Sequence, residues 1–107
     1  VSALRGIVGA DVTPDAAKTA ARDTMLQILA IVKKEIGDLD RIASIDALRG
    51  FVRSATDFME QPRVIDGASD LLIALWGEDG RHARSATGVN ALPFGAAVQI
   101  DMIARLK

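Results

Sequence analysis

Two stretches of the chain carry apolar residues at the spacing of an amphipathic helix. The first opens with Thr13-Pro14-Asp15, which supplies a hydroxyl for the N-cap, a proline at the first helical position and a carboxylate near the positive helix end. It closes at Lys33, Lys34 and Gly37. Between these limits the apolar stripe consists of Ala17, Ala21, Met25, Ile28, Val32 and Ile36. The pattern predicts a helix whose stripe packs against a core rather than around a cofactor.

The second stretch predicts a helix from about Pro62 to Trp76, with Gly77 as its stop. Its buried stripe is expected to contain Val64, Ile65, Ala68, Leu71, Leu72 and Leu75. Trp76 is expected to pack at the end of this helix rather than to stack on a nucleic-acid base.

The last part of the chain alternates with the period of a strand. Val98, Ile100, Met102, Ala104 and Leu106 fall on one face, whereas the other face is mostly polar with Gln99, Asp101, Arg105 and Lys107. Residues 85–89 form a shorter strand-like run, and Asn90, Pro93 and Gly95 provide a turn between the two runs. We expect the two runs to form a hairpin-like pair.

Residues 42–54 predict a third strand with apolar residues on both faces. Ile45, Ala47 and Phe51 occupy one side, and Leu48 and Val52 occupy the other. Such a strand suits the inside of a sheet, with one face on helices and the other on a partner subunit. Arg49 and Arg53 are interpreted as solvent or interface charges.

A further short strand is expected at Ile7 and Val8, bounded by Gly6 and Gly9. The order of elements is then strand, helix, strand, helix, strand, strand. This order predicts an α+β fold, a mixed sheet with two helices packed on one face. The 107 residues contain no internal repeat and no composition break, so a single domain over residues 1–107 is expected.

Composition narrows the possible partners. The chain has 13 basic and 14 acidic residues and a net charge of −1, which gives no bias toward nucleic acid or an anionic membrane. It has no cysteine, which excludes a disulfide framework or a thiol nucleophile. No apolar run has the length of a membrane span and no signal-peptide pattern opens the chain, so a cytoplasmic protein is expected.

Candidate chemistry centres on Arg84, at the start of the first of the two C-terminal strand runs. A guanidinium has five donors in a fixed fork that matches a carboxylate or phosphate. On sequence alone, an arginine is more often a solvated residue or an ion-pair partner. The single histidine, His82, has no companions at metal-ligand spacing and is interpreted as a surface residue.

The run His82-Ala83-Arg84-Ser85, followed by Leu92-Pro93 and Val98-Gln99-Ile100-Asp101, resembles the C-terminal signature of the Rid family, also called YjgF-like proteins. Further similarities occur upstream in the same order, at Gly9-Ala10-Asp11-Val12, Gly37-Asp38-Leu39-Asp40-Arg41, Gly50-Phe51-Val52 and residues 64–71. The resemblance covers nearly the whole chain. The chain most resembles a longer-chain, RidA-like subgroup whose members are often described as endoribonuclease-type (L-PSP) proteins.

The resemblance implies a chorismate-mutase-like fold, a homotrimer, and a site in each cleft between neighbouring subunits. Many Rid proteins are enamine/imine deaminases, so it also implies hydrolysis of small 2-imino acids to 2-oxo acids and ammonia. Arg84 would bind the substrate carboxylate, with Ala86 and Asp66 as further substrate-binding residues. The ligand would be a small carboxylate or imino acid, and neither a metal nor an organic cofactor is implied.

The chain departs from the family pattern on the last strand. Deaminating members carry a glutamate where alignment through Leu92-Pro93 places Gln99, and an amide cannot exchange a proton at neutral pH. Gln99 would therefore only hold the attacking water, unless the register differs and Asp101 takes the acid's place. A non-catalytic module that binds 2-oxo acids or other small carboxylates is the alternative function.

Two further expectations follow from the resemblance. RNA cleavage, an older description of the family, is disfavoured by the balanced charge and by the low aromatic content of one Trp and three Phe. Relatives usually carry more chain before the Gly9 segment, including a Ser-Gly-Gln strand, so the sequence is expected to lack N-terminal strands of the family domain.

Overall fold

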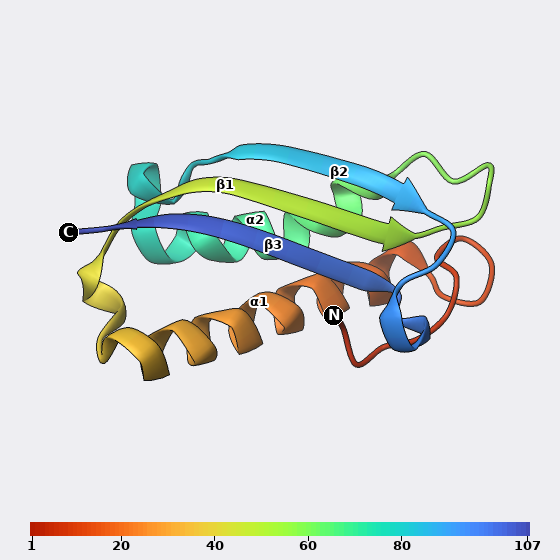
Figure 1. Ribbon diagram of the computed structural model, residues 1–107. Coiled ribbons are helices and arrows are strands. Elements are labelled where there is room, and N and C mark those ends of the chain that lie inside the picture. The colour runs from red at the N-terminus through yellow and green to blue at the C-terminus, as the bar shows by residue number, and fades with distance from the viewer.

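The computed structural model describes residues 1–107 and contains two long helices and a three-stranded sheet (Figure 1). The helices are α1, Pro14–Ile36, and α2, Gln61–Trp76. The strands are β1, Ile42–Arg53, β2, Ala83–Val89, and β3, Val98–Leu106. Single 3₁₀ turns at Leu39–Arg41, Gly77–Gly80 and Pro93–Gly95 lie in the connections. Both long helices lie on one side of the sheet, which confirms the predicted α+β arrangement.

The sheet order is β2-β1-β3, with β1 parallel to β2 and antiparallel to β3. The expected hairpin between the two C-terminal runs is therefore wrong, because β1 lies between them. The turn signal at residues 90–95 correctly predicts a break between the strands, but a turn does not specify whether the strands it joins are neighbours in the sheet. β1 has apolar residues on both faces and lies in the centre of the sheet, where β2 pairs with one of its edges and β3 with the other. Its predicted place inside the sheet is therefore confirmed.

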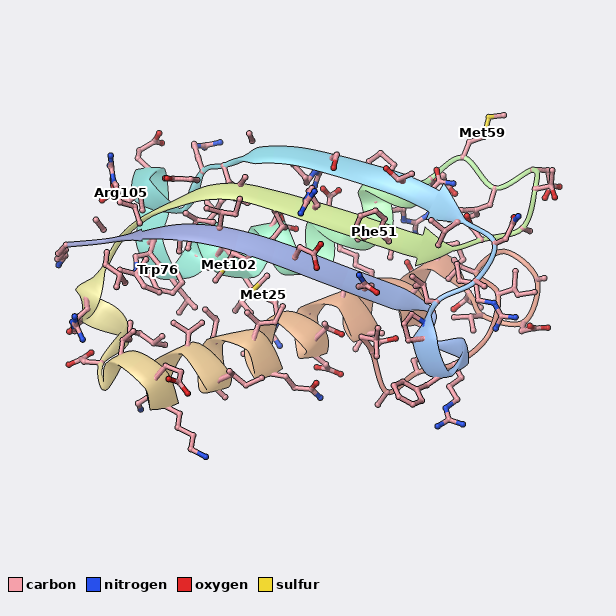
Figure 2. The ribbon with its side chains drawn as sticks, viewed as in Figure 1. Met25, Phe51, Met59, Trp76, Met102 and Arg105 are labelled. Atoms are coloured by element: carbon pink, nitrogen blue, oxygen red, sulfur yellow. The ribbon has the colours of Figure 1, made fainter.

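Both helices end where local signals predicted. Thr13 accepts a hydrogen bond from the Ala16 N–H at 3.1 Å, and Gly37 closes α1 at a φ of 88°. Gly77, at a φ of 60°, ends α2, and Trp76 packs against the edge of the core as expected. Figure 2 shows Met25 between α1 and the sheet, where it is fully buried. The apolar stripe of α1 thus serves packing.

β1 contains a register shift that changes which of its side chains are buried. Irregularities fall between Ile42 and Ser44 and between Ile45 and Ala47. Because of them Ile45 turns toward the helices and is buried together with Leu48, although the sequence pattern assigned these two residues to opposite faces. From Ala47 onward the strand alternates as predicted, with Val52 buried on the helix side.

Two glycines allow the layers to approach closely. A Cβ at Gly50 of β1 would lie 2.4 Å from the end of the Ile65 side chain, and a Cβ at Gly67 of α2 would lie 2.1 Å from the Lys18 carbonyl oxygen. Gly50 therefore brings α2 onto β1, and Gly67 brings α2 onto α1. These contacts fix the height of α2 above the sheet and hence the position of the side chains that it presents to β2.

The N-terminal residues form single bridges rather than the expected strand at Ile7 and Val8. Val8 is fully buried and bridges Val12 and Ser54. Gly6 and Gly9 both have positive φ values, 123° and 91°, so the backbone turns on either side of Val8 and cannot continue as a strand. No helix has the length and apolar character needed to cross a membrane.

Candidate functional site

Arg84, the second residue of β2, points toward α2. In the parallel register it lies beside Leu48 of β1, which is buried under the helices, so the Arg84 side chain leaves the sheet on the same side. There its Nη1 atom donates to Asp66 Oδ1 at 2.5 Å and to Ser69 Oγ at 3.3 Å. Only 26% of the Arg84 side chain remains exposed. The strand and helix together hold the guanidinium in one place.

A chain of hydrogen bonds continues behind the arginine. Ser69 Oγ lies 2.9 Å from Nε2 of His82, and Nδ1 of the same ring lies 2.7 Å from the Gly80 carbonyl oxygen. Because a carbonyl only accepts, the neutral ring carries its proton on Nδ1 and accepts from Ser69 through Nε2. Ser69 can then accept from Arg84 while it donates to His82. The predicted surface histidine instead fixes the serine that supports Arg84.

The outward edge of the guanidinium is free. Arg84 donates through Nη1, whereas Nε and Nη2 have no partner within the chain. Those two groups form the edge of the fork that binds a carboxylate with two parallel hydrogen bonds. Beside it is a surface hollow of about 200 Å³, lined by Asp66, Ser69, Asp70, Ile73, Arg81, His82 and Arg84. The hollow has the size and the donors to take a small carboxylate.

The structure brings together some of the expected site residues and separates others. Asp66 contacts Arg84 directly, and Ala86 lies two residues along β2 on the same, helix-facing side. Gln99 lies beside Phe51 of β1, on the open side of the sheet. β2 and β3 are also separated by β1, a distance of about 10 Å between strand axes. Within one chain, Gln99 therefore does not reach the Arg84 hollow.

Asp101, the other acid candidate, shares the open side of the sheet with Gln99. It makes an ion pair with Arg49 at 3.6 Å, and both side chains are largely exposed, at 45% and 63%. No group of three or more His, Asp or Glu side chains is placed to share a metal ion.

Sequence reasoning missed Ser69, Asp70 and the role of His82. The signal was present in α2, where Asp66, Ser69 and Asp70 follow the spacing i, i+3, i+4 and so form a polar stripe on a mostly apolar helix. Ser69 is only 5% exposed, and a nearly buried hydroxyl in a helix needs a partner from elsewhere in the fold. That partner, at residue 82, could not be identified without the tertiary structure.

Comparison with known proteins gives the chain a family. Residues 2–106 match the family model described as "YjgF/chorismate mutase-like, putative endoribonuclease". The chain belongs to the YjgF/chorismate mutase-like family. The Rid (YjgF-like) resemblance of the sequence is thereby confirmed, and the fold has the helices and mixed sheet of a YjgF-like protein.

The chain is similar to proteins from several organisms. Protein TCP17 of Trypanosoma cruzi is 44% identical over 104 residues, which cover 96% of this chain and 65% of that protein. The chain thus spans just under two thirds of the length of this curated relative. The crystal structure of protein Atu1372 from Agrobacterium tumefaciens, described as of unknown function, superposes with a TM-score of 0.95 at 46% identity, covering 98% of this chain and 68% of the other.

A second crystal structure is similar along nearly the same length of the chain. It is described as a "putative endoribonuclease" from Shewanella oneidensis and superposes with a TM-score of 0.93 at 34% identity. The match covers 97% of this chain and 69% of that chain.

Proposed function

We propose that this YjgF-like chain is an enamine/imine deaminase that hydrolyses small 2-imino acids to 2-oxo acids and ammonia. The observation that carries the proposal is the free Nε/Nη2 edge of Arg84, held at a hollow of about 200 Å³ by Asp66 and Ser69. A guanidinium fixed in this way binds a carboxylate without losing side-chain freedom on binding.

The proposed reaction needs few groups. Arg84 holds the carboxylate of R–C(=NH)–COO⁻, and water adds to the carbon of the C=N bond while the nitrogen gains a proton. The tetrahedral adduct then expels ammonia and leaves R–C(=O)–COO⁻. Because the C=N bond is already activated, positioning of the substrate and water supplies much of the required rate enhancement.

A homotrimer is part of this proposal. Gln99 would orient the attacking water, but it lies on the opposite side of the sheet from Arg84 within one chain. A neighbouring copy that presents its open sheet side to the Arg84 hollow would bring the two groups together. This requirement favours a site between subunits, as the Rid resemblance implied.

The second candidate function is a non-catalytic module for 2-oxo acids or other small carboxylates. Gln99 is the observation that favours it, because an amide can orient water but cannot transfer a proton. General acid or base catalysis contributes about 10²–10⁴-fold to typical enzymatic rates. A chain that lacks the acid could retain the ligand site and little chemistry.

RNA cleavage, the activity in the descriptions of the family and of the Shewanella relative, does not fit this site. The hollow beside Arg84 contains the carboxylates of Asp66 and Asp70, which repel a phosphodiester. The chain also has a balanced charge, without the excess of clustered Lys and Arg side chains that binding of a nucleic-acid backbone requires.

The test is the rate of 2-oxo acid formation from imino acids generated enzymatically in the same solution. We expect the native protein to exceed the buffer rate and Arg84→Ala to lose about 10- to 100-fold in kcat/KM, because a charge-assisted hydrogen bond contributes roughly 1.5–3 kcal/mol. Gln99→Glu is expected to raise kcat, because it supplies a group that can exchange protons. Arg5→Ala is a matched control, since Arg5 is exposed near the N-terminus, makes no side-chain hydrogen bond and does not line the hollow.

The result also separates the two candidates. If the native protein stays at the buffer rate but still binds a carboxylate through Arg84, the deaminase function is excluded and the binding module stands. Cleavage of RNA by protein free of contaminating nuclease, abolished in Arg84→Ala, would contradict both.

A further inference from the structure

We infer that the hollow beside Arg84 selects ligands that carry a cationic nitrogen next to the carboxylate, namely α-amino acids or protonated 2-imino acids, and that Asp70 recognises the nitrogen. The inference rests on the proposed carboxylate site at Arg84 and goes further, because it assigns a second, oppositely charged subsite. It would make a simple 2-oxo acid the weaker ligand.

The first observation is the pattern of charge around the hollow. Its lining contains two carboxylates and two guanidiniums rather than cations alone. Arg81 is paired with Glu78, outside the hollow, at 3.1 Å. Asp66 is paired with Arg84, but Asp70 is exposed and has no ion-pair partner. The hollow therefore presents one unpaired carboxylate beside the free edge of Arg84.

The second observation is the order of these groups along α2. Asp66 and Asp70 are four residues apart and so lie one turn apart on the same face of the helix, with Ser69 between them. Arg84 reaches this face from β2 and is anchored at Asp66 and Ser69. A ligand bound to the Nε/Nη2 edge thus has a carboxylate within about one helical turn, 5.4 Å, of its anchor.

This spacing matches the chemistry of an amino acid better than that of a plain acid. In an α-amino or 2-imino acid the nitrogen and the carboxylate group are attached to the same carbon, so their opposite charges lie close together. Arg84 can take the carboxylate while Asp70 and the second oxygen of Asp66 accept from the nitrogen. A ligand without the nitrogen leaves Asp70 unpaired beside a second negative charge, which lowers its affinity.

The experiment compares L-alanine with L-lactate, which has a hydroxyl in place of the ammonium group and nearly the same shape. Binding is followed by the amide chemical shifts of α2 and β2 in NMR titrations of the native protein. We expect alanine to bind about two- to fivefold more tightly than lactate, the effect of one solvent-exposed ion pair. Asp70→Asn should abolish this preference and leave lactate binding equal or stronger.

Asp57→Asn is the matched control, because it removes the same charge from an exposed loop residue that does not line the hollow. It should keep the preference for alanine. Lactate that binds as tightly as alanine, or a preference that survives Asp70→Asn, overturns the inference. If lactate binding is nonetheless lost in Arg84→Ala, the proposed carboxylate site stands while its second subsite fails. Absence of shifts with either ligand contradicts both.

Discussion

At the scale of single residues, the site depends on how a long, flexible arginine is held still. An arginine side chain loses up to about 2 kcal/mol of rotamer entropy when it is fixed. Here Asp66 and Ser69 fix it within the fold, before any ligand binds. The resemblance indicated Arg84 and Asp66 as candidates, and the structure places their side chains in contact, while their part in ligand binding stays a prediction. The sequence did not indicate Ser69 or His82, because their contact joins residues that only the packing of α2 on the sheet brings together.

Ser69→Ala tests this support. The substitution removes the hydroxyl that accepts from Arg84 and leaves Nε2 of His82 without its partner. We expect carboxylate affinity to fall about two- to tenfold, and the free energy of unfolding to fall by about 1 kcal/mol, since one buried hydrogen bond contributes roughly this amount. NMR titration with lactate and urea denaturation measure the two effects.

Ser85→Ala is the control for that experiment. Ser85 is adjacent to Arg84 in the chain but is exposed on the other side of β2 and makes no side-chain hydrogen bond. It should leave both quantities within about 0.5 kcal/mol of the native values, as is usual for surface substitutions. An equal loss in both variants would mean that Ser69 has no special role.

At the scale of elements, the helices were the most predictable part of the molecule. Their stripes and stops are local, so α1 and α2 were expected within a residue or two of their actual bounds, although Leu75, expected in the buried stripe of α2, is 54% exposed. The three strands of the sheet were located correctly, but the strand expected at Ile7 and Val8 does not form, and the neighbours in the sheet and one face of β1 were predicted wrongly. Strand pairing depends on the whole sheet. The register shift before Ala47 turns the Ile45 side chain to the opposite face of the sheet, and a simple alternation of residues does not indicate such a shift.

Gly67→Ala tests the close contact between the helices. Alanine is a better helix former than glycine by about 1 kcal/mol, so propensity alone predicts stabilisation. A Cβ at this position would instead meet the Lys18 carbonyl oxygen at 2.1 Å, and a backbone atom cannot move aside easily. We expect the free energy of unfolding to fall by about 1–3 kcal/mol, the usual cost of overpacking.

The propensity effect is measured separately by Ala30→Gly, at an exposed position of α1. That variant should lose about 1 kcal/mol. A Gly67→Ala protein that is more stable than the native one in urea denaturation would show that α1 and α2 can separate at little cost.

At the scale of the whole molecule, the sheet has one side on the helices and one side open. The open side carries an alternation of charged, polar and apolar groups, including Phe51, Gln99 and Ile103. Ile103 is 58% exposed although it lies in the middle of β3. The apolar residues on both sides of β1 predict a subunit contact on this face, and the proposed trimer would cover it.

Ile103→Lys tests whether the open side is the subunit contact. We expect the native chain of 11.3 kDa to form a trimer by light scattering coupled to size exclusion, and the variant to shift toward monomer while its far-ultraviolet circular dichroism is unchanged. A buried, unpaired lysine at an interface costs far more than the contact it replaces.

Ile31→Lys is the matched control, because Ile31 lies on α1 and is 64% exposed. It should leave the assembly state unchanged. A native monomer, or dissociation caused equally by both substitutions, would contradict an interface on the open side of the sheet.

The central position of β1 also limits how fast the molecule can fold. Ala47 of β1 pairs with Ala83, and Ile42 pairs with Leu106, so neither pairing of the sheet joins strands that follow one another directly in a tight turn. Each must close a long loop before any contact compensates for the lost chain entropy. Since folding rates fall as such non-local contacts dominate, we expect folding in milliseconds to seconds rather than microseconds. During that time β1 remains without its neighbours, and its apolar residues are exposed to other copies of the chain.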